Sequence, residues 1–311
     1  MPHGLIRGIL DNDHGSISKA ITLIENNKTP SEPFLSDIHA NAFDAIRIGI
    51  TGPPGAGKST LTNLLIEYYL AHDKTVGVIA VDPTSPFTGG ALLGDRVRMN
   101  KYVWDDRVFL RSMGNHCNLG GLSNKVQEIG DVLAASGKDF IIFETVGVGQ
   151  GEHDIINVAD ISIVVLVPES GDEIQLMKAG LIEIADIFVI NKSDREGANR
   201  IAATLKNILH VFKAEKELDP PVFNTIANKN EGLLELFKGI DSYLHLINKE
   251  GLLEIRRLER YRKRVFDLIR DSLEDSFWDS DKIDRLNQST KIIDRTTTAP
   301  HIIAKELLLK R

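Results

Sequence analysis

Eight consecutive residues, Gly52 to Ser59, have the types and spacing of a phosphate-binding loop. They read Gly-Pro-Pro-Gly-Ala-Gly-Lys-Ser and match the pattern G-x-x-x-x-G-K-[ST]. Backbone N–H groups of such a turn and the positive end of the following helix surround phosphates, while the lysine reaches the β- and γ-phosphates and the hydroxyl reaches Mg²⁺. The pattern predicts that a nucleoside triphosphate binds at Gly52, Pro53, Pro54, Gly55, Ala56, Gly57, Lys58, Ser59 and Thr60.

The tetrapeptide Asn191-Lys192-Ser193-Asp194 identifies the base of that nucleotide. N-K-x-D is the guanine-reading motif of GTPases, and here it directly follows a short apolar run that ends at Ile190. The Asp194 carboxylate can accept hydrogen bonds from two guanine N–H donors, which adenine does not offer as a pair. We therefore expect Asn191, Lys192 and Asp194 to bind GTP rather than ATP. The segment that completes guanine recognition is expected at residues 224–227, but it lacks the usual Ser-Ala pair.

Two carboxylates follow predicted strands and point to a magnesium centre. Asp82 ends the apolar run 76–81, and Glu144 ends the run 140–143. Both should lie at the edge of the sheet that carries the phosphate loop, where Mg²⁺ would take oxygen ligands from one hydroxyl, the phosphates and one or two carboxylates. Ser59, Asp82 and Glu144 are accordingly predicted metal ligands.

The residues after Glu144 resemble a nucleotide-dependent switch. In Glu144-Thr145-Val146-Gly147, the backbone N–H of Gly147 is predicted to bind the γ-phosphate, so that Lys58, Glu144 and Gly147 form the catalytic set. Val148 stands where Ras-like enzymes have the glutamine that orients the attacking water, and Gln150 is a possible substitute. We expect slow hydrolysis alone and faster hydrolysis when a partner supplies the missing contacts.

Short apolar runs alternate with helical patterns over residues 45–247, which predicts an α/β fold. The alternation indicates βαβ units, a mostly parallel central sheet and flanking helices, which together form a P-loop GTPase domain. The predicted strands are 46–50, 76–81, 140–143, 161–167, 187–190 and 222–223.

The flanking segments read as helical. Residues 1–44 are predicted to form an N-terminal helical extension, with Ile17, Ala20, Ile21 and Ile24 on one helix face, followed by a connection through Pro30 and Pro33. Residues 248–311 are predicted to form a helical arm, with helices at 252–273 and 300–309. The apolar face of this arm has few partners of its own, so we expect a homodimer.

Composition restricts the classes of partner. The 311 residues carry a net charge of −7, which makes nonspecific nucleic-acid binding a poor prediction. A basic cluster on the arm could bind RNA, but acidic residues interrupt it, so we expect it to face solvent or a partner instead. It contains Arg256, Arg257, Arg260, Arg262, Lys263 and Arg264. The single cysteine, Cys117, and the absence of a run of ~18 apolar residues favour a cytoplasmic protein without a membrane span.

Four segments together closely resemble the MeaB/ArgK family of P-loop GTPases. They are residues 81–99, 119–121, 144–150 and 191–194. The resemblance implies a GTP-hydrolysing chaperone that gates cofactor loading and protects an adenosylcobalamin-dependent acyl-CoA mutase, chiefly methylmalonyl-CoA mutase, and that dimerises through its arm. It also implies that Asp95 joins Lys58, Ser59, Asp82 and Glu144 in the phosphate and magnesium centre. The segment 114–118 departs from the family pattern.

Two alternative functions use the same loop. A nickel metallochaperone GTPase predicts a histidine-rich tract or Cys-x-x-Cys, whereas the nine histidines here are scattered singly. A kinase-like ATPase of amino-acid transport requires adenine preference despite Asp194. The sequence does not rank the possible partners of Arg96, Arg98 and Arg111, which are phosphates, a partner protein or surface carboxylates.

Overall fold

A computed structural model describes most of the chain and divides it into two compact units. The described residues are 2–26, 31–42, 44–82, 100–102, 104–114, 121–145, 157–168, 185–212, 218–289 and 299–309. The first unit is Met1–Arg260 and the second is Tyr261–Arg311. None of the helices in these ranges is long and apolar enough to cross a membrane.

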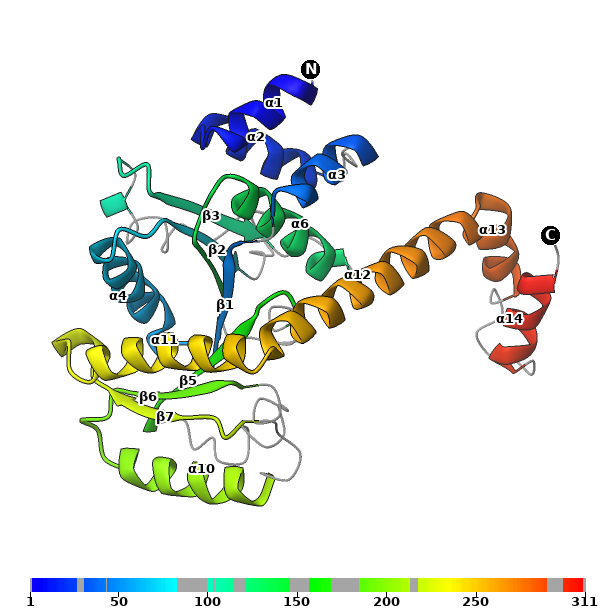
Figure 1. Cartoon of the computed structure of the whole chain (residues 1–311). Coiled ribbons are helices and arrows are strands. Elements are labelled where there is room, and N and C mark those ends of the chain that lie inside the picture. The colour runs from blue at the N-terminus through cyan, green and yellow to red at the C-terminus, as the bar shows by residue number, and fades with distance from the viewer. Residues whose placement is uncertain are drawn as a thin grey trace. The chain divides into compact units, whose positions relative to one another are not determined.

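A seven-stranded parallel sheet forms the centre of the first unit (Figure 1). Its strand order is β3-β2-β4-β1-β5-β6-β7, in which every hydrogen-bonded neighbour runs parallel. The α/β fold predicted from the sequence is confirmed. The strands are β1 (Ile46–Thr51), β2 (Val76–Asp82), β3 (Val108–Gly114), β4 (Phe140–Thr145), β5 (Ile161–Leu166), β6 (Ile187–Asn191) and β7 (Val222–Thr225).

Strand β3 is the one that the sequence pattern missed. Its sequence, Val-Phe-Leu-Arg-Ser-Met-Gly, contains polar residues, and its central side chains Leu110, Arg111 and Ser112 are only partly buried. An edge strand has one neighbour and one open side, so its apolar run is shorter than that of a strand covered on both faces. Strand β3 pairs with β2 along its whole length, from Val76↔Val108 to Asp82↔Gly114.

Helices cover both faces of the sheet (Figure 1). The core on one face joins Ile48, Ile142 and Ile163 to α4 (Lys58–Ala71) and α11 (Leu233–Lys249). On the other face, α6 (Gly121–Ala135) packs over the half of the sheet that carries β4, and α10 (Ala198–Phe212) packs over β5 and β6. Alternate residues of β2, β4, β5 and β6 therefore enter separate cores, as in parallel sheets covered on both sides.

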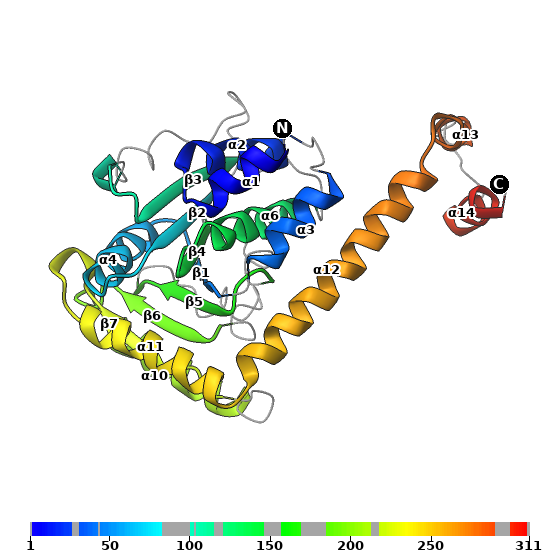
Figure 2. The same cartoon turned by 45° about the horizontal axis from the view of Figure 1, so that its top comes forward.

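Three N-terminal helices gather over α6 (Figure 2). They are α1 (Pro2–Leu10), α2 (His14–Glu25) and α3 (Glu32–Ala40). The predicted face of α2 is buried, with Ile17, Ala20, Ile21 and Ile24 directed into the core. Pro33 does not lie in an irregular connection as expected, because it occupies the first turn of α3, where a helix tolerates proline.

Arg111 of β3 binds this N-terminal layer. Its guanidinium forms an ion pair with Glu25 and donates to Thr22 Oγ1 at 3.2 Å. Lys125 on α6 donates to the backbone oxygen of Glu25 at 2.9 Å. The partner of Arg111 is thus a carboxylate of the same chain, whereas Arg96 and Arg98 lie outside the described residues.

The C-terminal helices are α12 (Leu252–Phe277), α13 (Ser280–Ser289) and α14 (Pro300–Leu309). Helix α12 begins in the first unit, and its arginines bind groups at the start of three strands. Arg256 forms an ion pair with Asp186 at 2.9 Å, Arg260 with Asp160 at 2.7 Å, and Arg257 Nη2 donates to the Ala45 oxygen at 3.0 Å. The expectation that the basic cluster faces solvent or a partner is therefore wrong for these arginines, since carboxylates before β5 and β6 bind two of them.

Candidate nucleotide site

The phosphate-binding loop lies between β1 and α4, as its sequence context predicts. Strand β1 ends at Thr51 and helix α4 begins at Lys58, so the loop occupies the carboxyl end of a central strand. The buried Lys58 side chain turns back into the loop, where Nζ donates to the backbone oxygens of Gly52 at 2.7 Å and Pro53 at 3.0 Å. These two bonds fix the ammonium inside the turn.

Close packing against β5 explains the first glycine of the loop. Gly52 has φ of +138°, and a Cβ built there would lie 2.1 Å from the backbone oxygen of Val165. A side chain at this position would force the loop away from the sheet. Pro54, Gly55 and Thr60, also predicted to contact the nucleotide, are exposed, while Ala56 is fully buried beneath the loop.

Ser59 and Glu144 meet at the end of the sheet. Ser59 Oγ donates to Glu144 Oε1 at 2.5 Å, and the Glu144 side chain is buried at the end of β4. The next residue, Thr145, shares a hydrogen bond of 2.9 Å with Thr51 at the end of β1. The hydroxyl and the buried carboxylate both provide hard oxygen atoms, which Mg²⁺ prefers as ligands. The Ser59–Glu144 pair therefore fits a magnesium site.

The remaining metal and catalytic candidates are only partly described. Asp82 is the last residue of β2, whose register pairs Ala80 with Glu144, so its backbone lies at the same edge of the sheet. Asp95 and Gly147 lie outside the described residues. Within the ranges that are described, no group of three or more His, Cys, Asp or Glu side chains is arranged to hold a metal ion.

Asn191 joins the phosphate loop to the predicted base-reading segments. It is buried at the end of β6, and its Nδ2 donates to the backbone oxygen of Ala56 at 2.8 Å. Its Oδ1 accepts from Thr225 Oγ1 at 3.2 Å and from the Ala227 N–H at 3.1 Å. Every polar atom of this side chain thus contacts a neighbouring loop, which brings segments 52–59, 191–194 and 225–227 together.

Asp194 lies on the exposed side of this junction and forms an ion pair with Lys229. The distance from Asp194 Oδ2 to Lys229 Nζ is 2.9 Å. The hydrogen bond from Lys229 lowers the pKa of Asp194, and the bond to Asp194 raises the pKa of Lys229. Lys192, two residues before Asp194, has φ of +56°, which turns the chain sharply after β6.

The sequence pattern predicted Asn191 as a site residue but did not single out the residues that bind its side chain. Thr225 and Ala227 lie in the segment expected to complete guanine recognition, and a hydroxyl residue at the end of β7 is a usable signal for Thr225. Lys229 lies on the short helix η4 (Ala227–Lys229) and carries no sequence signal, because an isolated lysine after a strand is common.

Comparison with known proteins agrees with these features. The family model described as methylmalonyl Co-A mutase-associated GTPase MeaB matches residues 17–282. A putative GTPase of Pyrococcus horikoshii is 44% identical over 268 residues, which cover 85% of this chain and 84% of that protein. GTPase ArgK of Escherichia coli is 33% identical, with 80% of this chain and 78% of ArgK covered.

A mammalian relative and a solved structure extend the comparison. The mitochondrial methylmalonic aciduria type A homolog of Mus musculus is 31% identical, with 88% of this chain and 70% of that protein covered. The crystal structure of a LAO/AO transport system kinase has the same fold, with a TM-score of 0.75 at 24% identity and coverage of 99% of this chain and 96% of that one. The family model covers most of the chain, and the motifs that predicted the resemblance lie within its range. The chain belongs to the MeaB/ArgK family of P-loop GTPases.

Proposed function

We propose that this GTPase acts as a chaperone of an adenosylcobalamin-dependent acyl-CoA mutase such as methylmalonyl-CoA mutase. In this role, GTP binding and hydrolysis gate cofactor loading and protect the mutase. The observation that supports nucleotide binding is the buried Asn191, because its hydrogen bonds unite the phosphate loop with the segments expected to read guanine. The family description and the name of the mouse relative support the choice of partner.

The chain's own groups have separate tasks in the proposed reaction. Backbone N–H groups of the loop residues 55–59 and the Lys58 ammonium bind the triphosphate, and Asp194 accepts hydrogen bonds from guanine. Ser59 and Glu144 would hold Mg²⁺, which would supply positive charge to the phosphates when it is bound. Asp82 and Asp95 are proposed to complete this centre.

Slow hydrolysis without the mutase is part of the proposal. The γ-phosphate contact is assigned to the Gly147 N–H, and Val148 cannot orient water as a glutamine would. A partner that supplies polar groups at this position accelerates hydrolysis. Coupling between two binding sites is reciprocal. The bound nucleotide can therefore control the mutase only if the GTP-bound and GDP-bound forms of this protein bind it with different affinities.

We also propose that the protein is a homodimer that uses the second unit. Apolar side chains recur along α12 and are substantially exposed, although single exposed apolar residues are common. Exposed apolar side chains that recur at helical spacing are a stronger indication of a protein-binding face than single ones. On α12 they are Tyr261, Val265, Leu268, Ile269 and Leu273.

The decisive experiment measures hydrolysis of GTP and ATP by the purified protein, with and without the adenosylcobalamin-dependent acyl-CoA mutase of the same organism. Slow turnover of GTP, much slower turnover of ATP and strong acceleration by the mutase are expected. Lys58→Ala should lower turnover about 100-fold or more while leaving the far-UV spectrum unchanged. If the mutase changes neither the rate nor the nucleotide affinity, the proposed partnership is wrong although the GTPase activity stands.

A further inference from the structure

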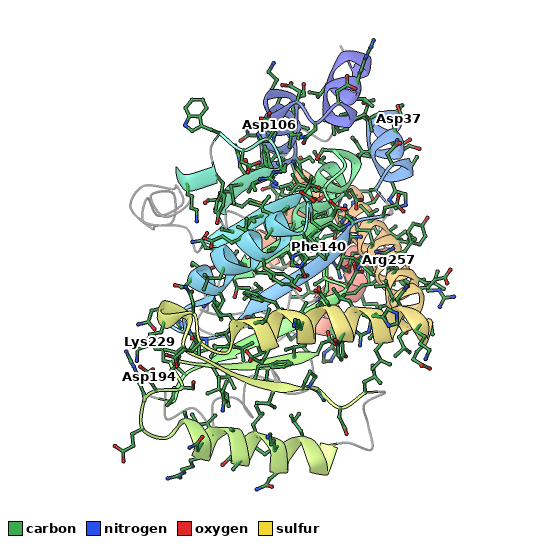
Figure 3. The ribbon with its side chains drawn as sticks, turned by 60° about the vertical axis from the view of Figure 1, so that its left-hand side comes forward. Asp37, Asp106, Phe140, Asp194, Lys229 and Arg257 are labelled. Atoms are coloured by element: carbon green, nitrogen blue, oxygen red, sulfur yellow. The ribbon has the colours of Figure 1, made fainter. Side chains whose placement is uncertain are left out.

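The ion pair between Asp194 and Lys229 joins two loops at the predicted base site. Figure 3 shows the two side chains next to each other beside the strand ends. The Asp194 side chain is 36% exposed and the Lys229 side chain is 51% exposed, so both remain accessible to a ligand. A pair this exposed adds little to folding stability. Its position beside the guanine-reading motif therefore invites a role in ligand recognition.

Backbone hydrogen bonds hold both partners in place. Ile226 and Glu231 exchange bonds across a tight turn, with N···O distances of 3.0 and 3.3 Å, and the Lys229 N–H binds the Ile226 oxygen at 2.9 Å. On the other loop, the Ser193 N–H donates to the Thr225 oxygen at 3.0 Å. The lysine is thus presented to Asp194 by an ordered turn that is itself tied to the Asn191-Lys192-Ser193-Asp194 segment.

The pair has the hydrogen-bonding order that complements guanine. Lys229 offers N–H donors next to Oδ2 of Asp194, and the two carboxylate oxygens are acceptors, so the order is donor, acceptor, acceptor. The corresponding edge of guanine presents the O6 acceptor followed by the ring N–H and 2-amino donors. Adenine presents an amino donor and a ring acceptor instead, so both members of the pair would oppose it.

A side-chain donor is needed here because a nearby backbone donor is already engaged. The Ala227 N–H, two residues before Lys229, binds Asn191 Oδ1 at 3.1 Å. An ammonium has three N–H donors, so the bond to Asp194 leaves two others on the same nitrogen. We infer that Lys229 is a specificity-determining residue whose ammonium donates a hydrogen bond to O6 of guanine while it holds Asp194 in position. This inference rests on the proposed function.

The test compares GTP with 6-thio-GTP, which keeps both N–H donors of guanine but replaces O6 by a poor acceptor. Dissociation constants are measured for the wild type, Lys229→Met and Lys229→Arg. Lys238→Met is the control, because Lys238 is an exposed lysine on α11 and its replacement removes the same charge. Lys229→Met should weaken GTP binding about tenfold and leave 6-thio-GTP binding nearly unchanged. Lys229→Arg should retain most of the preference for GTP, and Lys238→Met should behave as wild type.

Other outcomes separate the inference from the proposed function. If Lys229→Met weakens the binding of GTP and of 6-thio-GTP equally, the lysine only supports the loop. If it changes neither affinity, the Asp194–Lys229 pair is a surface ion pair without a role in binding. Either result overturns the inference. Inosine triphosphate lacks the 2-amino group but keeps O6. Lys229→Met should therefore weaken its binding by the same factor as it weakens the binding of GTP. If the wild type does not prefer GTP to ATP, the proposed function itself fails.

Discussion

The side-chain amide of Asn191 occupies the space beside Gly57. A Cβ built on Gly57 would lie 2.3 Å from Asn191 Nδ2, the nitrogen that binds the Ala56 oxygen at 2.8 Å. The last glycine before the loop lysine is therefore fixed by contact with the base-reading segment as well as by its φ of +93°. The phosphate loop and the base-reading segment fit together only when residue 57 has no side chain.

Gly57→Ala should therefore impair nucleotide binding more than Gly55→Ala. Both substitutions place alanine at positive φ, which costs about 1 kcal/mol, but a Cβ at Gly55 has no atom within 4 Å. The additional collision at Gly57 displaces Asn191, so we expect at least about tenfold weaker GTP binding in Gly57→Ala than in Gly55→Ala. Calorimetric titration with GTP measures the difference, and equal affinities would contradict the coupling of the two loops.

Ser59→Ala should raise the Mg²⁺ concentration needed for hydrolysis. The substitution removes the hydroxyl that contacts Glu144 at 2.5 Å, and with it one proposed oxygen ligand. We expect the half-saturating Mg²⁺ concentration to rise about tenfold or more, whereas Ser59→Thr keeps the hydroxyl and should remain close to wild type. A titration of GTPase rate against Mg²⁺ checks this, and identical curves for Ser59→Ala and wild type would remove Ser59 from the metal site.

Local patterns predicted the parts of the fold and site that are contiguous in sequence. The apolar run before Gly52 and the helical spacing after Ser59 define the strand, loop and helix by themselves. The buried face of α2 follows in the same way from the spacing of Ile17, Ala20, Ile21 and Ile24. In these cases the periodicity of the element decides which side chains meet the core.

Contacts between distant segments could not be read from these patterns. The Arg260–Asp160 pair joins residues 100 positions apart, and the Lys229–Asp194 pair joins residues 35 positions apart. A charged residue on a helix looks the same in sequence whether it faces solvent or a buried carboxylate. The surroundings of Arg256, Arg257 and Arg260 were misjudged for this reason. Strand β3 was missed because an edge strand tolerates residues such as Arg111.

Asp160→Asn should destabilise the protein strongly at neutral pH. The Asp160 side chain is fully buried, and it accepts from Arg260 at 2.7 Å and from the Arg47 N–H at 2.9 Å. Removing one charge from a buried ion pair leaves the other uncompensated, which costs about 3 kcal/mol of unfolding free energy. Urea unfolding at pH 7 measures this loss. Asp11→Asn is the control, because its ion pair with Arg7 is exposed and the substitution should leave stability unchanged.

The effect of Asp160→Asn should shrink in acid. Burial tends to raise the pKa of Asp160, but the charges of Arg260 and Arg257 outweigh it and lower the pKa below the ordinary value of 3.8. A carboxyl whose pKa is lower in the folded state stabilises the fold above its unfolded pKa, and this contribution is lost as pH falls through the folded pKa. The stability difference between wild type and variant should therefore narrow below about pH 4. A difference that stays constant into that range would show that the charge of Asp160 is not its cause.

Lys138→Met should stabilise the protein at neutral pH. The Lys138 side chain is buried, and its Nζ donates to the Asp106 backbone oxygen at 3.0 Å. Burial lowers the pKa of Lys138 to about 8, although the charges of Asp106 and Asp105 partly oppose the shift. A lysine whose pKa falls on folding disfavours the folded state wherever it is charged, so replacing it with an apolar side chain should add about 1–3 kcal/mol at pH 7.

The advantage of Lys138→Met should disappear in alkaline solution. As pH rises above about 8, the folded wild type loses the proton while the unfolded chain keeps it up to about 10.5, so wild-type stability rises relative to the variant across that interval. Urea unfolding of both proteins at pH 7 and pH 10 measures the two differences. Lys74→Met is the control, because Lys74 is half exposed and binds Asp139 at 3.2 Å. This substitution should not stabilise the protein at either pH. Equal stability of wild type and Lys138→Met at pH 7 would mean that the hydrogen bond to Asp106 and the nearby carboxylates fully offset the burial of the charge.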